Sequence, residues 1–226
     1  MFTFPVGLLG GERDSFYSNV SLLLLGNGVN NSTTFVDSGP ANRTVTASSG
    51  SPVITTSQFK YGNGSITGGV IETPYNSAFD WGTGDFTIEF WFRYSGTLAS
   101  DFRFCGGKTG NVFGFGSRIS GSRQIGILLE GVTWDTEFTW TPAGGNTWAH
   151  IALTRQSTTL RIFQNGTSLG SGTNSRNWNI NNSAFQIYCG TTVASGGAWL
   201  DDFRVTKGVA RYTANFTPPT TELPTN

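Results

Sequence analysis

Charge is scarce in this chain of 226 residues. Only 12% of the residues are charged, against about 25% in an ordinary globular protein. The 14 Lys and Arg residues balance 14 Asp and Glu residues, so the formal net charge is zero. Without a basic excess, the chain lacks the electrostatic attraction on which binding to duplex nucleic acid depends. We therefore expect no nucleic acid among its partners.

Histidine, cysteine and long apolar runs are also rare. One His and two Cys cannot complete a zinc site of the usual type. The longest apolar run, residues 20–25, is far shorter than the roughly 18 residues that cross a bilayer, so we expect no membrane insertion. The first 14 residues lack the basic and apolar stretches of an export signal. This favours assembly in a cytoplasm, with Cys105 and Cys189 as free thiols in the core.

Glycine, small polar residues and aromatic residues are abundant instead. There are 31 Gly, and Thr, Ser and Asn together make up 70 residues, which predicts a surface of hydroxyl and amide groups. The 18 Phe and 7 Trp residues are enough for the core of one large domain. No internal repeat divides the chain.

The hydrophobic pattern has a period of two. In residues 86–93 apolar and polar side chains alternate, as in a strand with one buried face. Trp91 interrupts the polar face, which indicates that a second layer, a loop or a ligand covers it. Asn165 and Gly166 lie between two alternating runs and predict a tight hairpin, because both turn positions need a positive φ. Further strands are expected at 20–25, 44–47, 58–61, 70–72, 102–105, 112–115, 124–129, 133–140, 149–154, 160–163, 185–189 and 202–205.

No window of a dozen residues fits a helix. Many short strands separated by Gly-rich turns predict an all-β fold, an antiparallel two-sheet jelly-roll sandwich.

Several motifs together resemble the laminin G-like, concanavalin A-like jelly-roll family. They are DFTIEFWFR (85–93), TWAHIALTR (147–155), LRIFQNGTSLGSGT (160–173) and WLDDFRVTKGVARYTANFTPP (199–219). The segments SNVSLLLLGNGVNNSTTFVDSGP (18–40) and GVARYTANFTPPT (208–220) are similar to versions of this module in structural proteins of tailed bacteriophages. The resemblance runs over residues 18–219, nearly the whole chain.

The resemblance implies two stacked sheets, with ligands or calcium held at loops along the rim. For the phage relatives it implies a virion part: a tail fibre, a head fibre or a capsid decoration. We accordingly divide the chain into an N-terminal segment (1–17), the jelly-roll domain (18–219) and an extended C-terminal tail (220–226). The extra N-terminal segment is a candidate virion anchor through its apolar residues Phe2, Phe4, Leu8 and Leu9.

Catalysis has little support in the sequence. His150, the single histidine, lies in the middle of an expected strand and is interpreted as a sheet residue. Cleavage of a glycan needs two carboxyl groups across a groove. Asp135 and Glu137 alternate on one strand and are expected to share a face, but the Glu-x-Asp-x-x-Glu strand of the glucanase members is absent. We therefore expect no enzyme.

Aromatic residues beside amides and acids indicate carbohydrate binding, because an indole can stack on a pyranose ring while neighbouring polar groups bind its hydroxyls. Trp178 lies in an expected loop and is the strongest candidate. The alternative is that these tryptophans, and Trp140 with them, fill the core or a subunit contact. The candidate carbohydrate-binding residues are Trp178 with Asn177 and Asn179, and Trp134 with Asp135 and Glu137.

Asp201 shares the inward face of its strand with Phe203. A buried carboxylate must be paired, hydrogen-bonded or coordinated. The favoured interpretation is that Asp201 accepts hydrogen bonds from loop amides. The alternative is a calcium ligand, with further oxygens from the loops of Asp37, Asp80 or Asp85. We expect no other cofactor and leave the metal open.

The sequence thus predicts a non-enzymatic phage virion structural protein, either a capsid decoration or a head or tail fibre component. It would display a lectin-like jelly roll that binds host-surface glycans. The alternatives are a receptor-binding carbohydrate-recognition module of a tail fibre and, less favoured, a glycan-cleaving enzyme. The expected partners are major capsid or tail proteins, further copies of the chain and a host glycan. The expected location is the virion, assembled in the host cytoplasm.

Overall fold

The computed structural model describes residues 13–129 and 133–226. Its regular elements are β-strands and two short 3₁₀ turns, η1 (Tyr17–Asn19) and η2 (Ser77–Phe79). The described residues contain no helix with the length and apolar character needed to span a membrane. The all-β, antiparallel two-layer prediction is confirmed.

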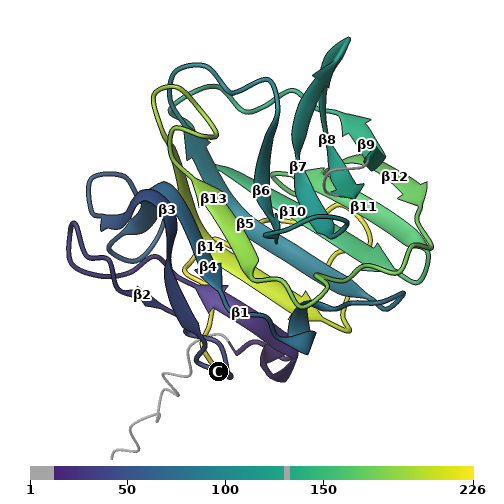
Figure 1. Ribbon diagram of the computed structural model, residues 1–226, viewed down its shortest axis with the longest axis horizontal. Helices are drawn as coiled ribbons and strands as arrows, with labels where there is room; N and C mark the ends of the chain where they lie inside the picture. The colour runs from purple at the N-terminus through teal and green to yellow at the C-terminus, as the bar shows by residue number, and fades with distance from the viewer. Residues whose placement is uncertain (1–12, 130–132) are drawn as a thin grey trace, which may run out of the picture.

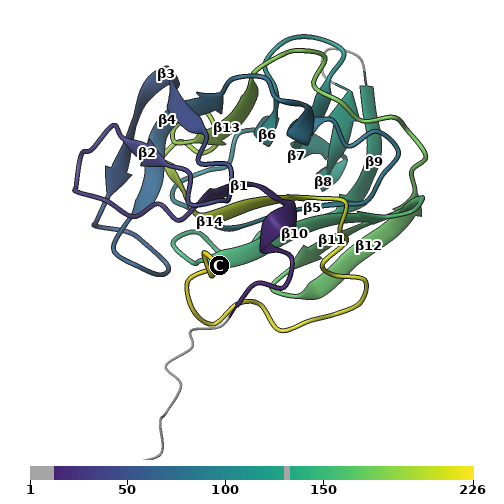
Figure 2. The ribbon, with the colours of Figure 1, turned by 90° about the horizontal axis from the view of Figure 1, so that it is seen from below.

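The strands form two layers that face each other (Figures 1 and 2). The back layer consists, in order, of β12 (Thr167–Thr173), β11 (Thr159–Gln164), β10 (Ala149–Gln156), β5 (Phe86–Tyr94), β14 (Ala198–Lys207) and β1 (Val20–Leu24). The front layer consists of β3 (Thr44–Thr55), β4 (Ser65–Thr73), β13 (Phe185–Cys189), β6 (Phe102–Gly107), β7 (Phe113–Ser120), β8 (Ser122–Leu129) and β9 (Thr133–Thr139). The short β2 (Phe35–Val36) pairs with β3.

Strand β4 joins the two layers. Its residue Thr67 pairs with Trp199 of β14 in the back layer, whereas residues 69–73 pair with β13 in the front layer. Gly68 lies between these two parts with φ of 91°, and a Cβ there would lie 2.4 Å from the carbonyl oxygen of Ser51. Only glycine fits this bend, so the sheet turns from one layer to the other at Gly68.

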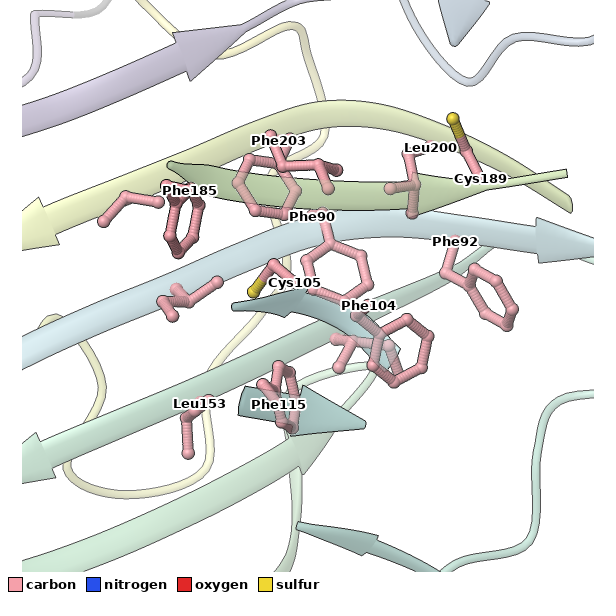
Figure 3. Packing of buried hydrophobic residues seen from close by; sticks show 14 of the residues in the cluster. Phe90, Phe92, Phe104, Cys105, Phe115, Leu153, Phe185, Cys189, Leu200 and Phe203 are labelled. Carbon is pink, nitrogen blue, oxygen red and sulfur yellow. The ribbon is translucent and has the colours of Figure 1, made fainter. Parts of the chain in front are cut away.

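The core between the layers is built mainly from aromatic rings (Figure 3). Phe90 of β5 lies 5.0 Å from Phe104 of β6 and 5.5 Å from Phe203 of β14, measured between ring centroids. Cys105 and Cys189 are buried free thiols, as expected. Burial raises the pKa of both thiols, so they behave as apolar core residues.

The loop of residues 56–64 covers Trp91 on the outer face of the back layer. The Tyr61 ring meets the indole edge-on at 5.8 Å, and Lys60 Nζ lies 4.2 Å from the indole centroid. A cover over Trp91 was expected, and a loop provides it. The strand expected at 58–61 is wrong, because the amides of Lys60 and Tyr61 donate to the Asp201 carboxylate and no strand is formed there.

Residues 208–226, which we call the C-terminal strap, cover more of the same face (Figure 2). Tyr212 and Phe216 stack on each other at 3.6 Å with an interplanar angle of 6°. Phe216 packs edge-on against His150 of β10 and Phe163 of β11, at 5.7 and 5.4 Å. These contacts fix the strap to the back layer.

A buried ionic network lies under the strap. Glu89 of β5 is fully buried and accepts hydrogen bonds from Arg204 Nη2 at 2.7 Å and Tyr212 Oη at 2.6 Å. His150 Nε2 lies 3.2 Å from the same carboxylate. Burial by itself raises the pKa of Glu89, but Arg204 and His150 outweigh it and hold this pKa far below the usual value. The polar side of the 86–93 strand, expected to be the exposed one, is therefore buried.

The packed domain extends beyond the expected limits of 18 and 219. Asp14 forms ion pairs with Arg204 at 3.0 Å and Arg211 at 2.7 Å. Its amide donates to the carbonyl oxygen of Asn226 at 2.9 Å. Leu223 is buried against the residues of β1. Of the expected virion anchor, Phe2, Phe4, Leu8 and Leu9 lie outside the described residues.

Candidate functional site

Trp178, the strongest sequence candidate for sugar stacking, is a core residue. Its side chain is 1% exposed, its Nε1 donates to Asn174 Oδ1 at 2.7 Å, and it meets Phe113 edge-on. The backbones of Trp178 and Gly82 exchange hydrogen bonds of 2.8 and 2.9 Å. This bridge turns the indole inward. The expectation of an exposed indole is therefore wrong, and Trp178 has no free face for a sugar.

The two neighbours of Trp178 are placed as expected, at the surface. Successive side chains of an extended segment point to opposite sides, so Asn177 and Asn179 project away from the core. With Tyr75 and Asp80 they line a cavity of about 280 Å³, which we call the asparagine pocket. Its lining is completed by Gly82, Asn181 and Asn182.

Asp135 and Glu137 do not form a pair. A register shift between β8 and β9 makes Asp135 an extra residue opposite Ile127 and Leu128, and such a bulge breaks the alternation of side chains. Asp135 is bound by Arg176 Nε at 2.7 Å. Glu137 is bound by Arg118 through two hydrogen bonds of 2.8 and 2.7 Å. The expectation of a shared face is therefore wrong.

The other tryptophans of this region differ from each other. Trp140 is buried, and its Nε1 donates to Gln164 Oε1 at 2.8 Å, so the core interpretation is right for it. Trp134 remains partly exposed on β9. Together with Tyr188 of β13 it lines a cavity of about 360 Å³ on the outer face of the front layer, which we call the front groove. Asp101, Phe102, Arg103, Leu128 and Thr192 complete the lining of the front groove.

An arginine fixes each of the two groove rings. The Arg118 guanidinium carbon lies 5.3 Å from the Trp134 ring centroid, and its contact with Glu137 holds it there. The Arg103 guanidinium carbon lies 4.6 Å from the Tyr188 ring centroid, and Arg103 also donates to the Tyr188 hydroxyl. Both rings are therefore held in place before any ligand binds, which lowers the entropic cost of binding.

Tyr188 and Asp101 were missed in the sequence. Phe185 and Ile187 of β13 point inward, so Tyr188, the residue after Ile187, points outward. The period of two in the sequence would have been enough to place its ring on the outer face. Asp101 is exposed at the rim, and within the described part of the chain its carboxylate has no hydrogen-bond partner. The groove thus combines two aromatic rings with a carboxylate acceptor and the Thr192 hydroxyl, a set of groups suited to a sugar.

Asp201 binds loop amides, as the favoured interpretation expected, but it does so on the outer face of the back layer. It pairs with Trp91, whereas Phe203 packs against Phe90 in the core. The inward face expected for Asp201 is wrong, because a register shift between Asp201 and Arg204 breaks the alternation of side chains. Asp201 Oδ2 accepts from the amides of Lys60 at 2.6 Å and Tyr61 at 3.1 Å. The calcium alternative is not supported: Asp37, Asp80 and Asp85 accept from other backbone amides, those of Leu23, Ile180 and Ser157. Across residues 13–129 and 133–226, no group of three or more His, Cys, Asp or Glu side chains is placed to hold a metal ion.

The order and two-layer packing of the strands are those of a jelly roll. Residues 62–210 match the model of the concanavalin A-like lectin/glucanases superfamily, in its laminin G form. The chain belongs to this superfamily. No curated protein matches the chain.

Several solved structures share the fold. The binding domain of Paraclostridial Mosquitocidal Protein 1 is 18% identical, with a TM-score of 0.63 over 86% of this chain and 50% of that one. The binding domain of botulinum neurotoxin DC, solved with rat synaptotagmin II, is 17% identical, with a TM-score of 0.62 over 86% and 50%. Botulinum neurotoxin type C, described as dependent on two ganglioside molecules for cell uptake, is 15% identical, with a TM-score of 0.60 over 86% and 49%. The chain spans about half the length of each, and at these identities the likeness shows the fold alone.

Proposed function

We propose that the protein is a non-enzymatic, lectin-like binding domain carried by a bacteriophage particle, and that its front groove binds a host-surface glycan. The observation that carries this proposal is the pair of fixed rings, Trp134 and Tyr188, in one open groove. Aromatic faces stack on the apolar side of a pyranose ring, while Asp101 and Thr192 offer polar groups to its hydroxyls. The ganglioside dependence described for the type C neurotoxin, and a second structure of the neurotoxin DC binding domain, solved in complex with SialylT, support a carbohydrate ligand.

The arrangement of carboxylates supports binding rather than cleavage. Glycoside hydrolysis needs two carboxyl groups roughly 5–9 Å apart, one of them with a raised pKa. Asp135 and Glu137 are each engaged by a different arginine. Burial raises the pKa of Asp201 to about 7 and of Asp202 to about 8, but both side chains are 1% exposed and out of reach of a glycan.

The place of the terminal segments supports display on a particle. The strap lies over the outer face of the back layer (Figure 2), and residues 13–16 line a cavity with it there. The front groove is formed by residues on the outer face of the front layer. A chain attached through its N-terminal segment would therefore present the groove outward. The resemblance to tailed-phage proteins in residues 18–40 and 208–220 supports a place on the capsid or the tail. The partners would be capsid or tail proteins and further copies of the chain, assembled in the host cytoplasm.

The glycan part is tested with Trp134→Ala, measured by isothermal titration against host polysaccharide. Loss of ring stacking should weaken binding about tenfold, equivalent to about 1.4 kcal/mol, while Trp134→Phe should retain most of the affinity. Unchanged affinity in a folded Trp134→Ala protein would exclude the front groove as the glycan-binding site. Failure of the unmodified protein to bind any host polysaccharide would exclude a host glycan as its ligand.

The display part is tested by deleting residues 2–12 while keeping Asp14 and its ion pairs. The shortened chain should keep the melting temperature of the full chain and be lost from purified particles. Normal incorporation would contradict the anchor. Crosslinking of the full chain in purified particles distinguishes the two locations. A crosslink to a capsid protein indicates the capsid, and a crosslink to a tail protein indicates the tail.

A further inference from the structure

The asparagine pocket lies at the other end of β6 from the front groove. Phe102, the first residue of β6, lines the groove. Lys108 directly follows the last residue of β6, and its amide donates to Ser183 Oγ at 2.9 Å, next to the pocket residue Asn182. The two cavities are therefore separate and share no lining residue.

The walls of the asparagine pocket are fixed to each other by hydrogen bonds. Asp80 Oδ1 accepts from the Ile180 amide at 2.9 Å, and its Oδ2 accepts from the Tyr75 hydroxyl at 2.7 Å. The backbone bridge between Gly82 and Trp178 joins the same two loops. Trp178, which the sequence suggested as the sugar platform, is instead the buried anchor that holds Asn177 and Asn179 at the surface.

The lining of this pocket is uncharged apart from Asp80. Four side-chain amides line it, and each amide carries both a donor and an acceptor, as a sugar hydroxyl does. Tyr75 is 38% exposed, and its ring offers an apolar face. None of the described lining residues is Lys or Arg, which disfavours an anion. Both oxygens of Asp80 already accept hydrogen bonds, which disfavours a metal ion.

We infer that the asparagine pocket is a second carbohydrate-binding site, for an uncharged sugar ring. Tyr75 stacks on the ring, its hydroxyl held by Asp80, while Asn177 and Asn179 bind the ring hydroxyls. This inference goes beyond the proposed function, because the pocket shares no lining residue with the groove. Either proposed site can therefore be disproved without disproving the other.

The test uses the full chain, with methyl glycosides of glucose, galactose and N-acetylglucosamine as neutral probes and sialyllactose as the acidic probe. Trp134→Ala serves as the background, since it weakens the groove. In this background Tyr75→Ala and Asn179→Ala should each lower the affinity for the best neutral probe about tenfold, as expected for a loss of about 1.4 kcal/mol. Tyr75→Phe keeps the ring and should stay within about threefold.

The matched control is Asn226→Ala. Asn226 is an exposed asparagine outside both cavities, and its side chain has no hydrogen bond within the described residues. Only its backbone carbonyl accepts a hydrogen bond, from the Asp14 amide, so Asn226→Ala should leave the affinity unchanged. Circular dichroism melting of every variant checks that the fold is intact.

The outcomes separate the two sites. Neutral-sugar binding that survives Trp134→Ala and is lost on Tyr75→Ala supports the second site. Binding that disappears with Trp134→Ala alone overturns the second site and leaves the groove. Tighter binding of sialyllactose than of every neutral probe in the Trp134→Ala background overturns the ligand class. Absence of sugar binding by the unmodified chain overturns this inference, and the proposed function is then judged separately on host polysaccharide and particle incorporation.

Discussion

On the outer face of the back layer, Glu89 meets Arg204 with side chains that are 0% and 5% exposed. On the outer face of the front layer, Glu137 meets Arg118 with side chains that are 24% and 32% exposed. The N···O distance is 2.7 Å in both pairs. The surroundings differ, because the strap covers the first pair and solvent reaches the second.

This difference assigns different roles to the same chemistry. A buried ion pair becomes very costly to break, because removing one partner leaves a charge in a medium of low dielectric constant. A partly exposed pair contributes little to stability but can hold an aromatic ring in position. The buried pair on the back face therefore stabilises the domain, whereas the partly exposed pair on the front face positions Trp134 in the front groove.

The largest expected effect is that of Glu89→Gln. This change leaves Arg204 and Arg211 buried beside a neutral amide and should lower the free energy of unfolding by about 3–5 kcal/mol. The measurement is urea unfolding at pH 7. Because the folded-state pKa of Glu89 is depressed, its contribution is fully present above pH about 4.5 and is lost as the pH falls below this value. A loss below 1 kcal/mol at pH 7 would contradict the contrast between the two faces.

An intermediate effect is expected from Asp202→Asn, at the register shift in the middle of β14, where the strap residue Leu223 hydrogen-bonds to the strand. Burial, followed by the charges of Asp201 and Glu222, raises the pKa of Asp202 to about 8. Folding thus favours its protonated form, and the stability falls as the pH rises from about 4 to about 8. Asn keeps the acceptor for the Leu223 amide and tolerates the φ of 49°.

Asp202→Asn should therefore raise the stability at pH 9 by roughly 1–3 kcal/mol and leave it almost unchanged at pH 3.5. Thermal melts at the two pH values measure the difference. An equal shift at both pH values would show that the native carboxyl group is not held in its protonated form.

The smallest expected effect on stability is that of Glu137→Gln, the front-face counterpart of Glu89→Gln. Because this pair is partly exposed, the free energy of unfolding should change by less than about 1 kcal/mol. Arg118 would no longer be held against Trp134, so sugar binding in the groove should weaken about threefold, measured by isothermal titration. If Glu137→Gln lowers the free energy of unfolding as much as Glu89→Gln does, the buried and the partly exposed ion pair contribute equally to stability, and the contrast between the two faces is wrong.

Most of the fold could be predicted from the alternation of side chains, and the hairpin from two residues. Asn165 and Gly166 adopt φ of 51° and 74° and join β11 to β12. The cover over Trp91 also followed from local pattern, whereas the register shift in β14 places Asp201 on the opposite face from Phe203, against the alternation. The hairpin depends on two adjacent residues. The cover over Trp91 could be predicted because an apolar residue stands where the alternation of the strand calls for a polar one.

The strap and the buried Glu89 could not be predicted in the same way. A polar residue on alternate strand positions gives the same pattern whether water or another segment covers it. The partners of Glu89 come from residues 204 and 212, more than 100 positions away, and the strap itself has no periodicity.

The candidate sites were predicted in part. Trp134, Asn177 and Asn179 line cavities, but the sequence did not indicate their aromatic partners Tyr188 and Tyr75. The inward turn of Trp178 depends on its backbone bridge to Gly82, a long-range pairing. The bulge at Asp135 likewise has no local signal.

The hydrogen bond between the amide of Asp14 and the carbonyl of Asn226 has a practical consequence for protein engineering. It holds the amide nitrogen of Asp14 2.9 Å from the carbonyl oxygen of Asn226, so a short linker could join residues 14 and 226. The hairpin at Gly121, where an added Cβ would meet open space, offers a place to reopen the chain. The domain is thus suited to circular permutation and to insertion as a single unit into a loop of another protein.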